Sequence, residues 1–193
     1  MATHIAFVNG KGGVGKTTCA MLIAAALAEA GQNVSIDDRD PQRSATTAAG
    51  IFGLPIGTTG SIVIIDTAPS LQHPATLDAI RTANFVVLVT TPSPLDLATT
   101  AATAKLIQAE RGGNTRILFN LVQTNNRFFT EMPGIAKELP FPAFENFIIR
   151  RTAYQTAQLQ GWRSIPSASR EDFIKVAMEL ARLLFQSSDN RKV

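Results

Sequence analysis

A segment near the N-terminus has the residue types and spacing of a phosphate-binding loop. Gly10–Thr18 reads GKGGVGKTT and satisfies the pattern G-x-x-x-x-G-K-[ST]. Its glycines allow the backbone to curl so that successive N–H groups point at phosphate oxygens. Lys16 would place a positive charge at the β- and γ-phosphates, and the Thr17 hydroxyl would be a Mg²⁺ ligand. The loop therefore predicts binding of ATP with Mg²⁺. The residues expected to bind the nucleotide here are Gly12, Gly13, Val14, Gly15, Lys16, Thr17 and Thr18.

A second lysine and two acidic segments supply further candidate residues for the phosphate and Mg²⁺ site. Lys11 lies beside the first glycine, and two ammonium groups in one small cradle repel each other unless a polyphosphate separates them. Asp38 and Asp40 follow a predicted strand, and Asp66 follows another. Because Asp66 comes directly after four apolar residues, it would be costly to bury without a cation or hydrogen bonds. Asp37 precedes Asp38, so either carboxylate is a candidate to face the metal.

Short apolar runs alternate with longer helical stretches along the whole chain. Continuous apolar strands separated by helices indicate a doubly wound α/β fold, in which a mostly parallel twisted sheet carries helices on both faces. Ligands of such a fold bind at the carboxyl ends of the strands, which is where the motifs fall. The predicted strands are 5–8, 34–36, 62–65, 85–90 and 116–121, and the predicted helices are 16–30, 41–50, 75–82, 95–111, 130–138, 152–159 and 170–186. Residues 52–60 are rich in Gly and Thr and are expected to form a flexible surface loop.

Several ordered motifs together resemble the ParA/MinD family of ATPases, and most of all its small plasmid-type ParA proteins. The phosphate loop, with its extra lysine, is similar to the family's deviant Walker A motif. The other matching segments are DRDPQ at 38–42, IVIIDTAPS at 62–70, TPSPLDL at 91–97 and IIRRTAY at 148–154. The likeness covers nearly the whole chain, although the stretch between Pro41 and Asp66 is short for the family.

The resemblance implies a role for each matching residue. Lys11 would reach across an ATP-sandwiched homodimer to the partner's nucleotide, while Lys16 would hold the phosphates in its own subunit. Asp40 would act in hydrolysis near the attacking water, so Lys11, Lys16 and Asp40 are the expected catalytic residues. Asp38 and Asp66 would join Thr17 around the magnesium. Asn120 would hydrogen-bond the adenine.

Composition and charge limit the kinds of partner that the protein can have. The formal net charge is +3 and the pI about 9.4, which permits an anionic partner without requiring one. The resemblance implies non-specific binding of nucleoid DNA, for which Arg150 and Arg151 are the candidates, and a ParB-like or cargo-adaptor protein that stimulates hydrolysis. The apolar stripe of the last predicted helix is typical of a core face, so we do not expect membrane binding.

The length of 193 residues suits one ATPase domain over 1–193. With one cysteine and no signal-peptide pattern, we expect a cytoplasmic protein. The resemblance implies that it is associated with the nucleoid. The main functional hypothesis is a DNA-partitioning or cargo-positioning ATPase. The alternatives are a small-molecule ATP-dependent enzyme, a MinD-like spatial regulator and a binding module without ATPase activity. The sequence does not distinguish the cargo.

Overall fold

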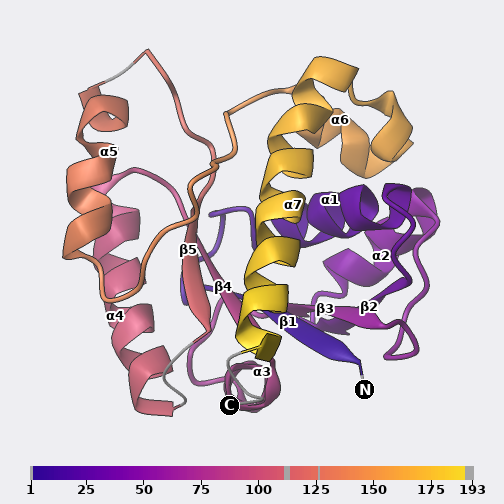
Figure 1. Ribbon diagram of the computed structural model, residues 1–193, viewed down its shortest axis with the longest axis horizontal. Helices are drawn as coiled ribbons and strands as arrows, with labels where there is room; N and C mark the ends of the chain where they lie inside the picture. The colour runs from indigo at the N-terminus through magenta and orange to yellow at the C-terminus, as the bar shows by residue number, and fades with distance from the viewer. Residues whose placement is uncertain (1, 111–113, 126, 190–193) are drawn as a thin grey trace.

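One parallel sheet forms the centre of the molecule. The computed structural model describes residues 2–110, 114–125 and 127–189. Within them, a 5-stranded sheet has the order β2-β3-β1-β4-β5 (Figure 1). The strands are β1 (Thr3–Val8), β2 (Val34–Arg39), β3 (Ile62–Thr67), β4 (Phe85–Thr90) and β5 (Thr115–Phe119). All neighbouring strands pair in parallel, so the predicted α/β fold class is confirmed.

Helices cover both faces of this sheet. They are α1 (Lys16–Glu29), α2 (Ser44–Phe52), α3 (Pro74–Thr82), α4 (Pro94–Glu110), α5 (Arg127–Glu138), α6 (Ala153–Gln160) and α7 (Ser167–Asp189), with a short 3₁₀ turn η1 (Trp162–Ser164). Ile5 and Phe7 of β1 join the core under α1, α2, α6 and α7. Ala6 and Val8 join a second core under α3, α4 and α5. Successive strand residues point to opposite faces, so apolar runs without polar interruptions are what a sheet covered on both sides needs.

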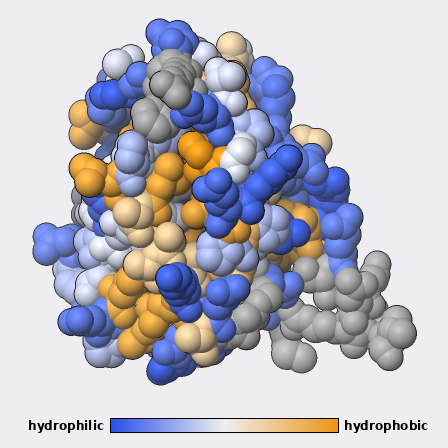
Figure 2. All heavy atoms as spheres, turned by 90° about the vertical axis from the view of Figure 1, so that its left-hand side faces the viewer, coloured by the Kyte–Doolittle hydropathy of each residue, from blue (hydrophilic) through white to orange (hydrophobic). Residues whose placement is uncertain are grey.

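The second core is covered less completely than the first. Phe129, Met132 and Ala136 of α5, and Leu139 just after it, are only partly buried against this core. Figure 2, which shows the side carrying α4 and α5, has hydrophobic residues gathered between hydrophilic ones. No helix in the described part of the chain is long and apolar enough to cross a membrane.

The strand order places the phosphate loop at the reversal point of the sheet. After β1 the chain goes to the outer strand β2 and returns to β3, which lies between β2 and β1, and it then crosses β1 to the other side for β4 and β5. At such a point the connections leave β1 and β4 in opposite directions, and a crevice forms at the carboxyl ends of the strands. The loop after β1 therefore lies in the ligand-binding position of the fold.

Two predicted boundaries around β2 are wrong. The strand runs on to Arg39 and includes the acidic residues, and α2 begins at Ser44 instead of Pro41. Arg43, just before α2, has a left-handed φ of 54°, so the backbone turns sharply between Asp40 and Ser44 before the helix starts. Pro41 and Gln42, which suggested a helix start, belong to that turn. The end predicted for α4 at Arg111 lies outside the described residues.

Residues 52–60 are not a free loop. The Ile36 amide donates to the Pro55 carbonyl (2.9 Å), and the Gly57 amide donates to the Ile36 carbonyl (2.8 Å). Ile36 and Ile56 thus form a parallel bridge on the outer edge of β2. A side chain at Gly60 would meet backbone atoms of Asn33, Ser35 and Ile62 within 3 Å. The shortened connection is therefore packed against the sheet edge.

A buried carboxylate of the last helix, α7, accepts hydrogen bonds from the loop that precedes α6. Glu179 of α7 accepts hydrogen bonds from the amides of Glu145 (2.7 Å) and Asn146 (3.0 Å) and from the Asn146 side chain (2.8 Å). These residues lie in the loop that follows β5 and α5. A single acidic side chain thus joins α7 to the segment that runs along the outer edge of β5.

Replacing this carboxylate should destabilise the fold. Glu179→Ala leaves two backbone N–H groups and one amide without their acceptor, so we expect the free energy of unfolding to fall by about 3 kcal/mol. The measurement is urea-induced unfolding followed by circular dichroism. Met178→Ala is the matched control, because Met178 is 68% exposed on the same helix, and its effect should stay within about 0.5 kcal/mol. Equal effects of the two substitutions would contradict the anchoring role.

Candidate functional site

The phosphate loop is a curled backbone that leads into α1. Gly13 and Gly15 have left-handed φ values of 81° and 89°, which side chains disfavour and glycine permits. α1 begins at Lys16 without a side-chain cap, so its first N–H groups remain available to an anion at the helix N-terminus. This confirms the predicted order of strand, glycine loop and helix.

Lys16 is buried and its ammonium lies close to the loop backbone. Its Nζ donates to the Lys11 carbonyl oxygen at 3.1 Å, and only 6% of the residue is exposed. Burial lowers the pKa of Lys16, while the nearby Asp66 and Asp40 carboxylates oppose that change. The structure therefore brings Lys16, Asp40 and Asp66 together around the loop, as the sequence predicted from the carboxyl ends of β1, β2 and β3.

Thr17 and Asp66 form a pair that fits a magnesium ion. The Thr17 hydroxyl donates to Oδ2 of Asp66 at 2.7 Å, while Oδ1 of Asp66 is buried and has no hydrogen-bond partner among the described residues. Burial raises the pKa of Asp66 to about 7, despite the opposing hydrogen bond from Thr17. A divalent cation would satisfy the unpartnered oxygen. Mg²⁺ keeps several waters and takes phosphate oxygens as ligands, so few protein oxygens are required.

The two aspartates around β2 have different surroundings. Asp38 is in register with Asp66 of β3 and only 6% exposed, and its carboxylate accepts hydrogen bonds from Thr46 and from the Asp40 amide. Asp37 instead pairs with Arg39 (2.8 Å), which also contacts Asp78 of α3 (2.7 Å). Of these two candidates, Asp38 is therefore the one placed beside the Thr17–Asp66 pair.

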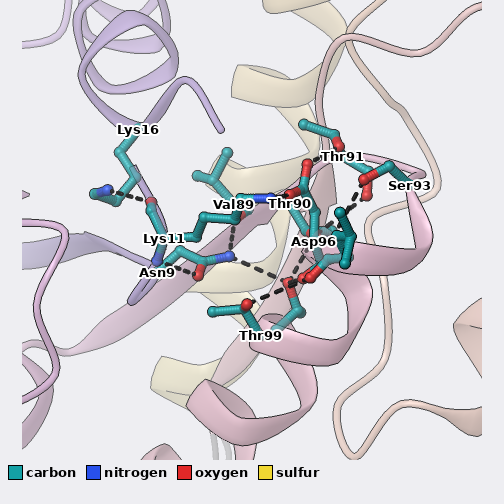
Figure 3. A network of polar contacts seen from close by, with 11 residues as sticks. Asn9, Lys11, Lys16, Val89, Thr90, Thr91, Ser93, Asp96 and Thr99 are labelled. Atoms are coloured by element: carbon teal, nitrogen blue, oxygen red, sulfur yellow. Dashed lines mark hydrogen bonds and ion pairs between the residues drawn. The ribbon is translucent and has the colours of Figure 1, made fainter. Parts of the chain in front are cut away.

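Lys11 turns toward α4. Its ammonium forms an ion pair and a hydrogen bond with Asp96, which also accepts from the Thr91 hydroxyl (Figure 3). Burial alone would raise the pKa of Asp96, but hydrogen bonds from Lys11, Thr91 and Ser93 outweigh it and the pKa is lowered. Figure 3 shows the Lys16 ammonium on the opposite side of the loop. The two ammonium groups thus point away from each other in this structure, although Lys16 contacts the Lys11 backbone.

A polar network beneath the loop was not foreseen. Asn9 donates to the Val89 carbonyl (2.7 Å) and to the Thr100 hydroxyl (3.1 Å), and its own Oδ1 accepts from the Lys11 amide (2.9 Å). The Gly10 amide donates to the Thr103 hydroxyl (3.3 Å). These contacts join β1, β4 and α4 at the root of the loop. The available signal was the series of threonines inside an otherwise Ala- and Leu-rich helix, because buried hydroxyls need partners.

Asn120 lies under the phosphate loop. Its side-chain amide donates to the Val14 carbonyl at 2.8 Å, and only 3% of the residue is exposed. A side chain added at Gly15 would collide with this same amide. Asn120 therefore supports the loop backbone in this structure, and the contact with adenine stays a prediction.

Arg150 and Arg151 are adjacent but are not equivalent. Nε of Arg151 donates to Asp172 of α7 (3.0 Å) and to the Tyr154 hydroxyl (3.1 Å), and the Asp172 carboxylate raises the pKa of the guanidinium. Arg150 is exposed, and its backbone amide donates to the Val122 carbonyl at 2.9 Å. Arg150 is therefore presented to solvent, whereas Arg151 fastens the start of α6 to α7.

These features define the class of protein. A doubly wound parallel sheet with a glycine-rich loop, a buried lysine and a Thr–Asp pair at its reversal point is a P-loop nucleotide-binding domain. The model of the CobQ/CobB/MinD/ParA nucleotide-binding domain family matches residues 5–163. The chain belongs to this family, whose cofactors are ATP and Mg²⁺.

Individual relatives agree with this assignment. A maintenance of carboxysome distribution protein A from Gloeobacter kilaueensis is 36% identical over 203 aligned positions, which cover 92% of this chain and 94% of that protein. MinD of Pyrococcus horikoshii in complex with Mg-ADP has a TM-score of 0.72 at 17% identity, covering 97% and 99% of the two chains. Cobyrinic acid a,c-diamide synthase of Mycobacterium smegmatis with ADP and magnesium has a TM-score of 0.72 at 20% identity, covering 94% and 95%. The two structural likenesses concern the fold.

Proposed function

We propose that this chain is an ATPase that positions a cargo by cycling between DNA-bound and free states. The observation that carries the proposal is the second lysine, Lys11, at the mouth of a phosphate loop that already has Lys16. Lys11 is exposed enough to leave Asp96, with 38% of its side chain accessible, whereas Lys16 is buried. Lys11 is therefore the one able to reach a nucleotide held by another subunit, which supports an ATP-sandwiched homodimer.

Each chemical role that ATP hydrolysis needs has a candidate residue in this chain. Loop amides and Lys16 hold the phosphates, Thr17 and Asp66 hold Mg²⁺, and Asp40 orients the attacking water. Bound Mg²⁺ neutralises charge on the phosphates, which is the main requirement of phosphoryl transfer. Because Lys16 and the two aspartates lie close together in the structure, no large rearrangement of the sheet edge is needed to assemble them.

Similarity to a carboxysome distribution protein over nearly the full length supports a protein assembly as the cargo. In the proposed cycle, ATP closes the dimer, the dimer binds nucleoid DNA, and a ParB-like or cargo-adaptor partner stimulates hydrolysis and releases the DNA. Nucleotide state and DNA affinity are then coupled, and the coupling must be reciprocal.

The test is retention of the protein on DNA with ATP, with ADP and without nucleotide. The proposal requires strong retention with ATP alone. Equal retention in all three conditions would refute it. ATP turnover that needs a small metabolite and is unaffected by DNA would support the alternative of a small-molecule enzyme, which the shared fold also hosts in the cobyrinic acid synthase.

The two adjacent arginines should behave differently in this test. Arg150→Ala should weaken DNA binding and reduce the slope of log affinity against log salt by about 1, as expected for one lost phosphate contact. Arg151→Ala should mainly lower stability, because it leaves Asp172 without its cation. Arg81→Ala is the control, since Arg81 is an exposed arginine paired with Glu110 at the end of α3, away from the phosphate loop. If the slope of log affinity against log salt were the same in Arg150→Ala as in the wild-type protein, Arg150 would not be part of the DNA-binding surface.

A further inference from the structure

The carboxylate of Asp38 is occupied by donors from its own chain. Its Oδ2 accepts from the Thr46 amide (2.7 Å) and from the Thr46 hydroxyl (2.7 Å). Its Oδ1 accepts from the Asp40 amide (3.1 Å). Three donors therefore converge on one side chain that is only 6% exposed. A carboxylate in this setting holds the surrounding backbone in place.

Asp38 supplies the cap that α2 otherwise lacks. The residue before this helix, Arg43, makes no side-chain cap and has a left-handed backbone. The amides of a first helical turn have no partner within the helix, and negative charge is favourable there. Thr46 provides one of those amides, and Asp38 reaches it from the end of β2. The start of α2 is thus fixed to the strand by a residue outside the helix.

The same side chain fixes Asp40. While Asp38 accepts the Asp40 amide, Oδ1 of Asp40 accepts from the Gln42 amide (3.0 Å), and the Asp40 carbonyl accepts from the Arg43 amide (2.9 Å). The guanidinium of Arg43 donates a hydrogen bond to the Asp38 carbonyl oxygen (3.0 Å). The turn from Asp40 to Thr46 is therefore held at both ends by Asp38. Asp40 is thereby kept near Lys16.

Asp66, unlike Asp38, has few hydrogen-bond donors around its carboxylate. One of its oxygens is buried without a partner among the described residues, and the other accepts only the Thr17 hydroxyl. We propose that Asp38, itself held by Thr46, is a positioning residue that keeps Asp40 against the phosphate loop by accepting the Asp40 amide, and that Thr17 and Asp66 alone supply the protein ligands of Mg²⁺. This inference rests on the proposed ATPase function.

The decisive substitution removes a hydroxyl beside Asp38 and leaves Asp38 itself intact. Thr46→Val keeps the shape and the backbone amide but deletes one charge-assisted hydrogen bond, so we expect kcat for ATP to fall about tenfold. The affinity for ATP and the Mg²⁺ concentration for half-maximal binding should stay within about twofold, because no metal ligand is touched. Thr46→Ser should restore kcat. Thr47→Val is the matched control, since the Thr47 hydroxyl contacts only the Arg43 carbonyl among the described residues.

A metal titration of Asp38→Asn separates the two roles of this aspartate. Asp38→Asn should lower kcat like Thr46→Val and leave the Mg²⁺ requirement of nucleotide binding unchanged. A requirement raised about tenfold by Asp38→Asn but not by Thr46→Val would make Asp38 a metal ligand and overturn the inference. A kcat of Thr46→Val equal to that of Thr47→Val would overturn it as well.

Hydrogen exchange keeps the inference testable apart from the ATPase. In Thr46→Val, amides of residues 40–47 should exchange faster than in Thr47→Val, whether or not the wild-type protein hydrolyses ATP. Absence of ATP turnover in the wild-type protein with these exchange rates intact would refute the proposed function and leave the positional role standing. Equal exchange in the two variants would overturn the positional role itself.

Discussion

Lys11→Ala is expected to bind ATP as a monomer while losing ATP-dependent dimers, stimulated hydrolysis and retention on DNA. Lys16, Thr17 and the loop amides all remain, so the nucleotide site of one subunit is intact. In the proposed dimer the lost contact would be a buried charge pair between subunits, and we expect its removal to cost about 3 kcal/mol, or more than a hundredfold in the dimerisation constant. Analytical ultracentrifugation with a non-hydrolysable ATP analogue measures it.

A matched control separates this effect from a general loss of charge. Lys105→Ala removes an equal charge from an exposed position on α4, and its dimerisation should match that of the wild-type protein. If Lys11→Ala formed dimers as readily as Lys105→Ala, the sandwich model would be untenable. Because Lys11 pairs with Asp96 in this structure, the proposed dimer requires Lys11 to leave that carboxylate when ATP binds.

Gly15→Ala should abolish nucleotide binding and lower stability together. The residue has a φ of 89°, and a methyl group there would run into the side-chain amide of Asn120. The backbone strain alone costs about 1–2 kcal/mol. Relief of the collision would have to break the hydrogen bond from Asn120 to the Val14 carbonyl, which supports the loop. We expect ATP affinity to fall by at least about a hundredfold, or about 3 kcal/mol, as measured by isothermal titration calorimetry.

Gly13→Ala isolates the strain from the collision. Its φ of 81° is similar, but nothing lies within 4 Å of the position that a methyl group would take. Its loss of thermal stability should therefore be clearly smaller than that of Gly15→Ala. The double substitution Gly15→Ala with Asn120→Ala should recover part of the stability, because the collision is gone and only the backbone strain and the lost hydrogen bond to the Val14 carbonyl remain. Equal Tm values for Gly13→Ala and Gly15→Ala would argue against packing of Asn120 as the cause.

The parallel sheet and the phosphate loop were predictable because both depend on local patterns. Ile62–Ile65 is apolar throughout, and a strand buried on both faces needs that composition. The loop after β1 follows from glycine and lysine spacing alone. The end of β2 was not predictable in this way, because Asp37 and Asp38 resemble loop residues and are held in the strand by pairing with β3.

The contacts that organise the site depend on residues distant in the chain. Nothing in the composition of α2 indicates that Asp38 would accept its first-turn amide, since the usual capping position is Arg43. Arg151 differs from Arg150 because it pairs with Asp172 of α7. This difference could not be inferred from two adjacent arginines in the sequence. Sequence patterns name the groups that touch phosphate, whereas the groups that hold them in place emerge only from tertiary packing.

The covering of the outer strands limits how copies of this protein could polymerise. The bridge of Ile36 to Ile56 protects the outer edge of β2, and the bridges of Ile117 to Ala143 and Val122 to Ile149 protect the side of β5. Exposed strand edges are the usual templates for growth of one sheet into another. Any filament built from this chain would therefore have to grow through helix and loop surfaces, so it should be reversible with nucleotide state and should not bind amyloid dyes.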